Sequence, residues 1–141
     1  MKIHLKRLNN NYHFETVNER GHVVSLDNNS EPEPKGASPM ELLLMGLAGC
    51  SSIDIVMILK KQHLEINRLE MEVEGFRKEN AVPKIFTAIH LKIFVDGDLP
   101  ENKVLRAVDL SLEKYCSVAK MLEKTAKITT EVVLNGATVP A

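Results

Sequence analysis

The first part of the chain alternates apolar and polar residues in short runs, which predicts three β-strands. These strands are expected at residues 2–8, 13–17 and 22–26. Asparagine-rich and glycine-containing segments between the runs favour turns. The following segment, residues 28–37, is polar and contains Pro32 and Pro34, so we expect a loop there.

The next pattern is almost continuously apolar, from residue 42 to residue 59, and predicts a long helix. Ser38 is a suitable N-cap, Pro39 suits the first helical position, and Glu41 completes a capping box with Ser38. The helix is therefore expected to begin at this motif and to end near Gln62.

Small residues within this helix are expected to let another backbone come close. They are Gly46, Ala48 and Gly49. The helix is also long enough to span a membrane. However, it contains Asp54, and a carboxylate near the centre of a bilayer is costly, so a buried central helix is the better interpretation.

The second half of the chain predicts a hairpin, a helix and a last strand. In the first hairpin strand, residues 69–74, apolar and polar residues alternate strictly. In the second strand we expect every other residue to be buried, from Ile85 through Thr87 to Val95. A helix then starts at Pro100 and reaches Cys116, and it continues through Leu122 either directly or after a break. A strand follows at residues 127–134. The order is β-β-β-α-β-β-α-β, so we expect one α+β domain over residues 1–141.

Charge and composition exclude several classes of partner. Lys and Arg number 18 against 19 Asp and Glu, which argues against electrostatic capture of nucleic acid or of an anionic membrane. Aromatic residues are only 4% of the chain and Trp is absent, so base-stacking surfaces are not expected. The basic N-terminus lacks an apolar signal core, and we therefore expect a cytoplasmic protein.

The chain has two cysteines, Cys50 within the apolar helix and Cys116. Such a pair is either inert packing or a shielded redox centre. Because the five histidines are scattered and no CxxC or HxxxH spacing occurs, neither a metal nor another cofactor is expected. Asp54, one turn after Cys50, is expected to pair with Lys114, Lys120 or a backbone donor.

Two segments resemble the OsmC/Ohr family. The run SPMELLLMGLAGC at residues 38–50 is similar to the family's first-cysteine helix, and EKYCSVA at residues 113–119 is similar to its second-cysteine segment. Within the family, the YhfA-type branch has similar SPME, GCS-x-ID and DLS-x-EKYCSVA-x-MLEK stretches. The resemblance implies two central helices packed on curved antiparallel sheets and an intertwined homodimer.

The resemblance also implies an enzyme, a thiol-dependent peroxidase that reduces organic, lipid-type hydroperoxides in oxidative stress defence. The peroxidatic Cys50 would attack the peroxide and become a sulfenic acid. The resolving Cys116 would then form a disulfide with it, and a dithiol or lipoyl-type reductant would reopen that disulfide. No cofactor takes part in this chemistry.

This chain departs from the family pattern at the charged residues. Where the family has the glutamate that holds the catalytic arginine, this chain has Met40, and Glu41 lies one residue later. Glu41 is therefore either an arginine-holding residue or only a helix cap. Arg20 is the candidate stabiliser of the thiolate or oxyanion, against the alternative of a solvated turn residue. A non-enzymatic dimer that binds a hydrophobic small molecule, or a slow redox sensor, is the alternative function.

Overall fold

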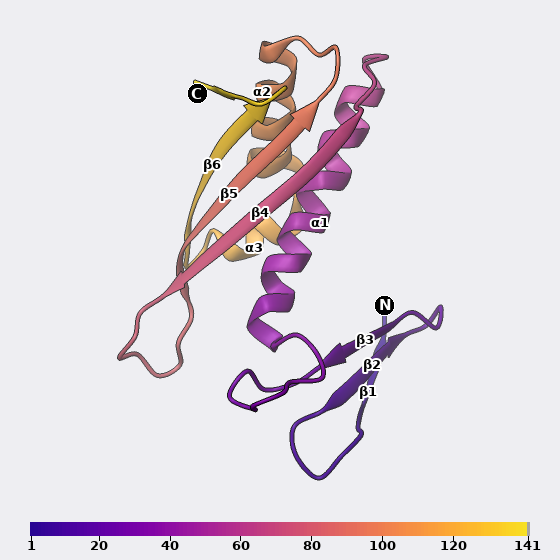
Figure 1. Cartoon of the computed structure of the whole chain (residues 1–141), viewed down its shortest axis with the longest axis vertical. Coiled ribbons are helices and arrows are strands. Elements are labelled where there is room, and N and C mark those ends of the chain that lie inside the picture. The colour runs from indigo at the N-terminus through magenta and orange to yellow at the C-terminus, as the bar shows by residue number, and fades with distance from the viewer. Residues whose placement is uncertain (141) are drawn as a thin grey trace. The chain divides into compact units, whose positions relative to one another are not determined.

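The computed structural model describes residues 1–140. It has an α+β architecture with two sheets and confirms the predicted fold class (Figure 1). The chain forms two compact units, Met1–Leu43 and Leu44–Ala141, which are described separately below. The expectation of one domain over residues 1–141 stays a prediction.

The N-terminal unit contains an antiparallel sheet in the order β1-β2-β3. Its strands are β1 (Ile3–Arg7), β2 (Phe14–Asn18) and β3 (Val23–Leu26), each within two residues of its expected bounds. The β2–β3 turn is closed by a hydrogen bond from the Gly21 amide to the Asn18 carbonyl, with Gly21 at a φ of 85°. Glycine occupies this left-handed conformation without a steric penalty.

Helix α1 (Pro39–Lys60) begins at the predicted capping box. The Ser38 amide donates to Glu41 Oε2 at 2.7 Å, and the Glu41 amide donates to Ser38 Oγ at 3.3 Å. The hydrogen bond from the Ser38 amide, together with the Ser38 hydroxyl, lowers the pKa of Glu41. The two hydrogen bonds satisfy backbone groups that the first helical turn leaves without partners.

We expect Ser38→Ala to lower the free energy of unfolding by about 1 kcal/mol, because the Glu41 amide loses its acceptor. Urea denaturation followed by circular dichroism would measure the difference. Ser30→Ala is the matched control, since only the backbone amide of Ser30 takes part in a hydrogen bond, to Asn28 Oδ1. Equal midpoints for both variants would contradict a stabilising cap.

The length and composition of α1 would also allow it to cross a membrane. The central helix of a soluble protein can have the same length and composition, so these two properties do not distinguish a membrane helix from a core helix. Leu47, Ser51, Ile55 and Leu59 lie at intervals of four residues and are all buried. Such a stripe is typical of a helix that packs one side against a protein core.

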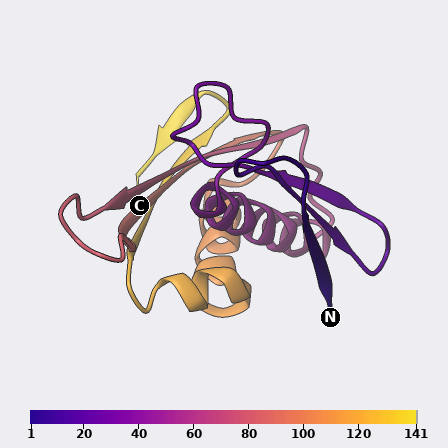
Figure 2. The ribbon, with the colours of Figure 1, turned by 90° about the horizontal axis from the view of Figure 1, so that it is seen from below.

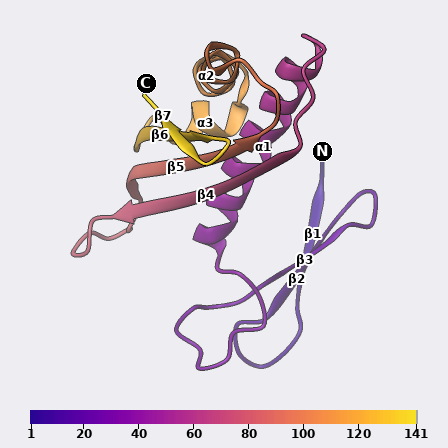
Figure 3. The same ribbon diagram turned by 45° about the horizontal axis from the view of Figure 1, so that its top comes forward.

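The C-terminal unit contains a second sheet in the order β4-β5-β6-β7. Figures 2 and 3 show it curving over α1, with the other helices on the same side. The β4–β5 and β6–β7 pairs are antiparallel, but β5 and β6 are parallel. The expectation of purely antiparallel sheets was therefore wrong at this pair, because a helical crossover returns the chain in the same direction. The strands are β4 (Arg68–Arg77), β5 (Phe86–Asp96), β6 (Lys127–Leu134) and β7 (Ala137–Val139).

The buried face of β5 differs from the prediction at its start. Ile89 to Val95 bury every second residue as expected, but Ile85 is 47% exposed, Thr87 is also exposed, and Phe86 is buried. The reason is a β-bulge in β5 itself: Phe76 pairs with Ala88 and Arg77 pairs with Phe86, so Thr87 is an extra residue without a partner on β4. A bulge changes the direction of the side chains next to it.

Strand β7 was absent from the expected order of elements. It follows a tight turn at Asn135 and Gly136, whose φ angles are 49° and 82°. Positive φ at both positions is the requirement of a two-residue hairpin turn, and Asn-Gly is its strongest sequence signal. The dipeptide itself therefore contained the information needed to predict this hairpin.

The expected second helix is divided into three pieces. Helix α2 (Glu101–Leu110) passes into a π-helical turn, η1 (Ser111–Tyr115), and α3 (Ser117–Leu122) follows. Between η1 and α3, Cys116 has an extended backbone with φ −70° and ψ 103°. A break in the helix thus falls at the second cysteine.

Candidate functional site

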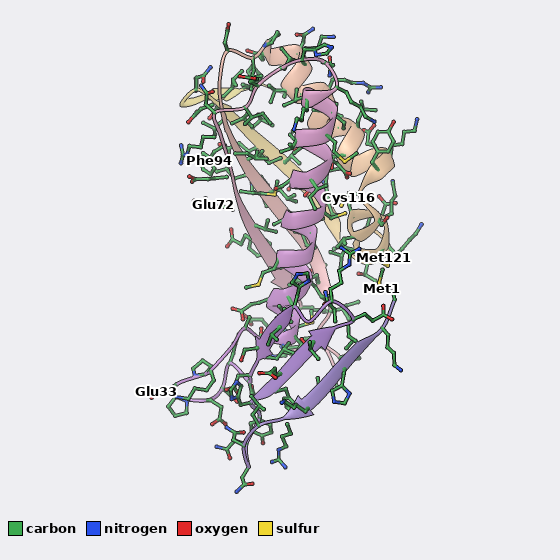
Figure 4. All side chains as sticks on the ribbon, turned by 90° about the vertical axis from the view of Figure 1, so that its right-hand side faces the viewer. Met1, Glu33, Glu72, Phe94, Cys116 and Met121 are labelled. Atoms are coloured by element: carbon green, nitrogen blue, oxygen red, sulfur yellow. The ribbon has the colours of Figure 1, made fainter. Side chains whose placement is uncertain are left out.

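The two cysteines lie close together in the C-terminal unit. Cys50 lies in the middle of α1 and is half-buried, whereas Cys116 is completely buried between η1 and α3. The two sulfur atoms and a carboxylate oxygen of Asp54 all lie within 4.8 Å of one another. Figure 4 shows Cys116 beside the middle of α1. The structure therefore brings together two residues that are 66 positions apart in the sequence.

The helix break holds Cys116 in place. Its amide donates to the Ser111 carbonyl at 2.7 Å, which closes the π-helical turn. Its Sγ accepts a hydrogen bond from the Ala119 amide at 3.3 Å and thereby caps α3. π-Helical turns are rare in proteins, and many of those that are found lie at functional sites. The first hydrogen bond fixes the backbone of Cys116, and the second fixes its sulfur.

Burial, together with the hydrogen bond and the charge of Cys50, raises the pKa of the Cys116 thiol to about 11. The backbone amides of Ala119 and Val118 act in the opposite direction, but their effect is smaller. Cys116 is therefore a protonated thiol at neutral pH. Because a thiolate is the nucleophilic form, Cys116 is poorly suited to the first attack on a substrate.

We expect Cys116 to resist pulsed alkylation by iodoacetamide at pH 8 and to react progressively faster as the pH approaches 11. Mass spectrometry of the separated cysteine peptides would measure the rate at each pH. In Cys50→Ser the rise should occur at lower pH, because a group that raises the pKa of Cys116 has been removed. Rapid labelling of Cys116 at pH 8 in the wild type would contradict this assignment.

Asp54 is held by a serine and not by a lysine. The Ser111 hydroxyl, which is completely buried, donates to Asp54 Oδ2 at 3.2 Å and also lies 3.4 Å from the Ser51 carbonyl oxygen. Of the expected partners, Lys114 stacks on a tyrosine ring and Lys120 pairs with Glu123. The expectation of a lysine partner was thus wrong.

Ser111 was not among the predicted site residues, although it lies in the DLS-x-EKYC stretch that carries the family resemblance. Its side chain is too small and too common in sequences to indicate a site by itself. Its importance depends on the π-helical turn, which the apolar pattern did not reveal. Three-dimensional contact is what assigns Ser111 to the site.

The remaining candidates, Arg20 and Glu41, belong to the N-terminal unit. Arg20 lies in the turn between β2 and β3, with an exposed side chain and its amide hydrogen-bonded to Asn18 Oδ1 at 3.0 Å. Glu41 forms the capping box with Ser38. The catalytic roles of both residues stay predictions.

One face of α1 is apolar and open. Met45, Ile53 and Met57 are at least half exposed on this face. A side-chain carbon added at Gly46 or Gly49 would have no atom within 4 Å among the contacts of the described chain. The close backbone expected at these glycines is therefore not found within Leu44–Pro140. By helical position, Cys50 lies at the edge of the open face.

Comparisons with known proteins identify the family. Residues 32–131 match the family model described as OsmC, OsmC-like protein. The chain belongs to the OsmC family. It is 49% identical over 110 residues to Protein YhfA of Escherichia coli strain K12, which covers 77% of this chain and 80% of that protein.

Solved OsmC-like structures share this fold. A hypothetical protein from Aquifex aeolicus is 32% identical, with a TM-score of 0.80 over 95% of this chain and 96% of that one. An organic hydroperoxide resistance protein OsmC from Legionella pneumophila is 20% identical, with a TM-score of 0.69 over 94% of this chain and 96% of that one. The second likeness establishes the fold alone.

Proposed function

We propose that this protein is a thiol peroxidase that reduces organic, lipid-type hydroperoxides through Cys50 and Cys116. The proximity of the two sulfur atoms, within 4.8 Å, is the observation that supports it. Membership of a family that includes redox proteins of this kind adds to the support. A disulfide bond requires the sulfurs to approach to about 2.05 Å, a movement that side-chain rotation and a small shift of the helix break can supply.

The environments of the two thiols support a different role for each. Cys50 is half-buried at the edge of an open apolar face and is the peroxidatic residue. Cys116 is completely buried, its thiol is protonated at neutral pH, and it is the resolving residue. The apolar side chains near Cys50 bind the alkyl part of the hydroperoxide.

The proposed reaction has three steps. The Cys50 thiolate attacks one peroxide oxygen, the O–O bond breaks, and the alkoxide takes a proton to leave as an alcohol. The sulfur of Cys116 then attacks the Cys50 sulfenic acid, and its thiol proton leaves with the hydroxyl group as water. Finally, an external dithiol reduces the disulfide by exchange and is itself oxidised.

The charged partner of Cys50 belongs to the same proposal. Arg20 is the candidate that stabilises the thiolate and the departing alkoxide, and Glu41 is a candidate to hold it in addition to capping α1. The active unit is a homodimer whose two copies cover the apolar faces of their α1 helices. The cytoplasm, where thiols are kept reduced, is the compartment that suits this chemistry.

The decisive experiment measures dithiol-dependent consumption of tert-butyl hydroperoxide by the wild type and by Cys50→Ser. We expect the wild type to consume peroxide and the variant to fall to the background rate. Ser52→Ala, two residues further along α1, is the control and should keep its activity. Wild-type consumption no faster than that of Cys50→Ser would refute the peroxidase and favour the non-enzymatic dimer.

A further inference from the structure

We propose that, in the reduced protein, Cys50, Asp54 and Cys116 form a binding site for a thiophilic divalent metal ion of the Zn²⁺ class. Their three ligand atoms lie within 4.8 Å of one another. Nothing in the proposed peroxidase reaction requires Asp54, so the carboxylate beside two thiols needs a separate explanation. A metal ion that uses all three groups provides one.

The spacing of the three atoms suits tetrahedral zinc. Bonds of about 2.3 Å to sulfur and about 2.0 Å to oxygen place neighbouring ligand atoms roughly 3.5 to 3.8 Å apart. Atoms already within 4.8 Å reach this spacing by small side-chain rotations. Three protein ligands leave a fourth position for water, as in zinc sites that keep an open position.

Two of the ligands lie on a helix, and backbone hydrogen bonds hold the third in place. Cys50 and Asp54 are four residues apart on α1 and therefore share one face of that helix. Cys116 comes from the break between η1 and α3, where two backbone hydrogen bonds fix it. The region around Cys116 is visible beside α1 in Figure 4.

Ser111 supplies the supporting hydrogen bond that metal sites usually have. Its buried hydroxyl donates to Asp54 Oδ2 at 3.2 Å, which fixes the carboxylate and leaves further lone pairs for an ion. Ligating carboxylates are commonly oriented in this way, and loss of such a partner typically weakens metal binding about 10- to 100-fold.

The charges also favour a cation. A bound metal ion would displace the proton of the Cys116 thiol, and its positive charge would offset the repulsion among the carboxylate and the two thiolates that ligate it. None of the ion pairs formed within residues 1–140 involves Asp54. Two sulfur ligands select a thiophilic ion over Mg²⁺ or Ca²⁺, which prefer oxygen.

The expectation of no metal rested on the absence of CxxC and HxxxH spacings. The fold instead assembles ligands from positions 50, 54 and 116, a combination that no short motif describes. Metal binding and disulfide formation use the same two sulfurs, so they exclude each other. A bound ion therefore protects the reduced pair from oxidation.

The test is anaerobic titration of the fully reduced protein with Co²⁺, followed by displacement with Zn²⁺. We expect one ion per chain, a thiolate-to-cobalt charge-transfer band, and loss of that band on addition of Zn²⁺. Asp54→Asn should weaken binding at least about tenfold, and Ser111→Ala about 10- to 100-fold. Cys50→Ser and Cys116→Ser should each weaken the band or abolish it.

Asp109→Asn is the control, because Asp109 is an exposed acid on the neighbouring α2 and should not affect binding. Wild-type protein converted to the disulfide should give no charge-transfer band. Cobalt binding without that band, or binding unchanged in Asp54→Asn, would overturn the proposal. Because peroxide is absent throughout, failure here is distinguishable from failure of the peroxidase.

Discussion

Cys116→Ser is expected to complete one round of peroxide reduction and then to stop. Cys50 remains able to attack the peroxide, but the sulfenic acid it forms no longer has a resolving thiol within 4.8 Å. Multiple-turnover consumption of tert-butyl hydroperoxide with a dithiol should fall by roughly 100-fold or more. A stoichiometric burst of alcohol should remain, because the first step does not use Cys116.

Intact mass spectrometry distinguishes the attack of Cys50 on the peroxide from the formation of the disulfide. One equivalent of peroxide should convert the wild type to a disulfide, whose mass is about two units lower. The Cys116→Ser variant should instead gain one oxygen and react with dimedone, a reagent that labels sulfenic acids. Ser117→Ala alters an exposed residue next to Cys116 and should behave as the wild type. If Cys116→Ser turned over at the wild-type rate, Cys116 would not be the resolving residue.

Ile53→Asp is expected to convert a dimer into a monomer. Ile53 is 62% exposed on the open face of α1, a large apolar side chain for a position in contact with water. In a dimer that covers this face, an aspartate would place an unpaired charge in the interface. The cost is about 3 kcal/mol or more, which weakens Kd by roughly 100-fold or more.

Sedimentation velocity over a range of protein concentrations measures this change. Val82→Asp is the matched control, because Val82 is 97% exposed in the loop between β4 and β5. It introduces the same charge away from α1 and should leave the dimer intact. A wild type that sediments as a monomer at every concentration, or an Ile53→Asp variant that remains dimeric, would show that this face is not the interface.

Local patterns were sufficient to predict most elements of the fold. The alternating strands, the capping box at Ser38 and Glu41, and the last strand all follow from side-chain periodicity and short-range hydrogen bonding. The parallel pairing of β5 and β6 and the bulge at Thr87 do not, because they depend on contacts between distant segments. Non-local pairing leaves little signal in a single sequence.

The candidate site could likewise be predicted from the sequence only in part. The family resemblance pointed to Cys50 and Cys116. Apolar periodicity correctly placed Cys50 on a helix, but Cys116 lies in the break between η1 and α3. Neither could predict that Ser111, five residues before Cys116, turns its hydroxyl to Asp54, because that contact depends on a π-helical turn. The charged partner of Cys50 was predicted only as Arg20, from its position in the chain.

The parallel pairing of β5 with β6 has a consequence for the protein while it is being synthesised. At about 5 to 20 residues per second, Cys116, which is 66 positions after Cys50, is added roughly 3 to 13 seconds after it. The crossover that carries Cys116 is fixed on the sheet only after β6 has emerged and paired with β5. Until then a nascent chain has Cys50 without the neighbouring thiol that the folded protein places within 4.8 Å of it.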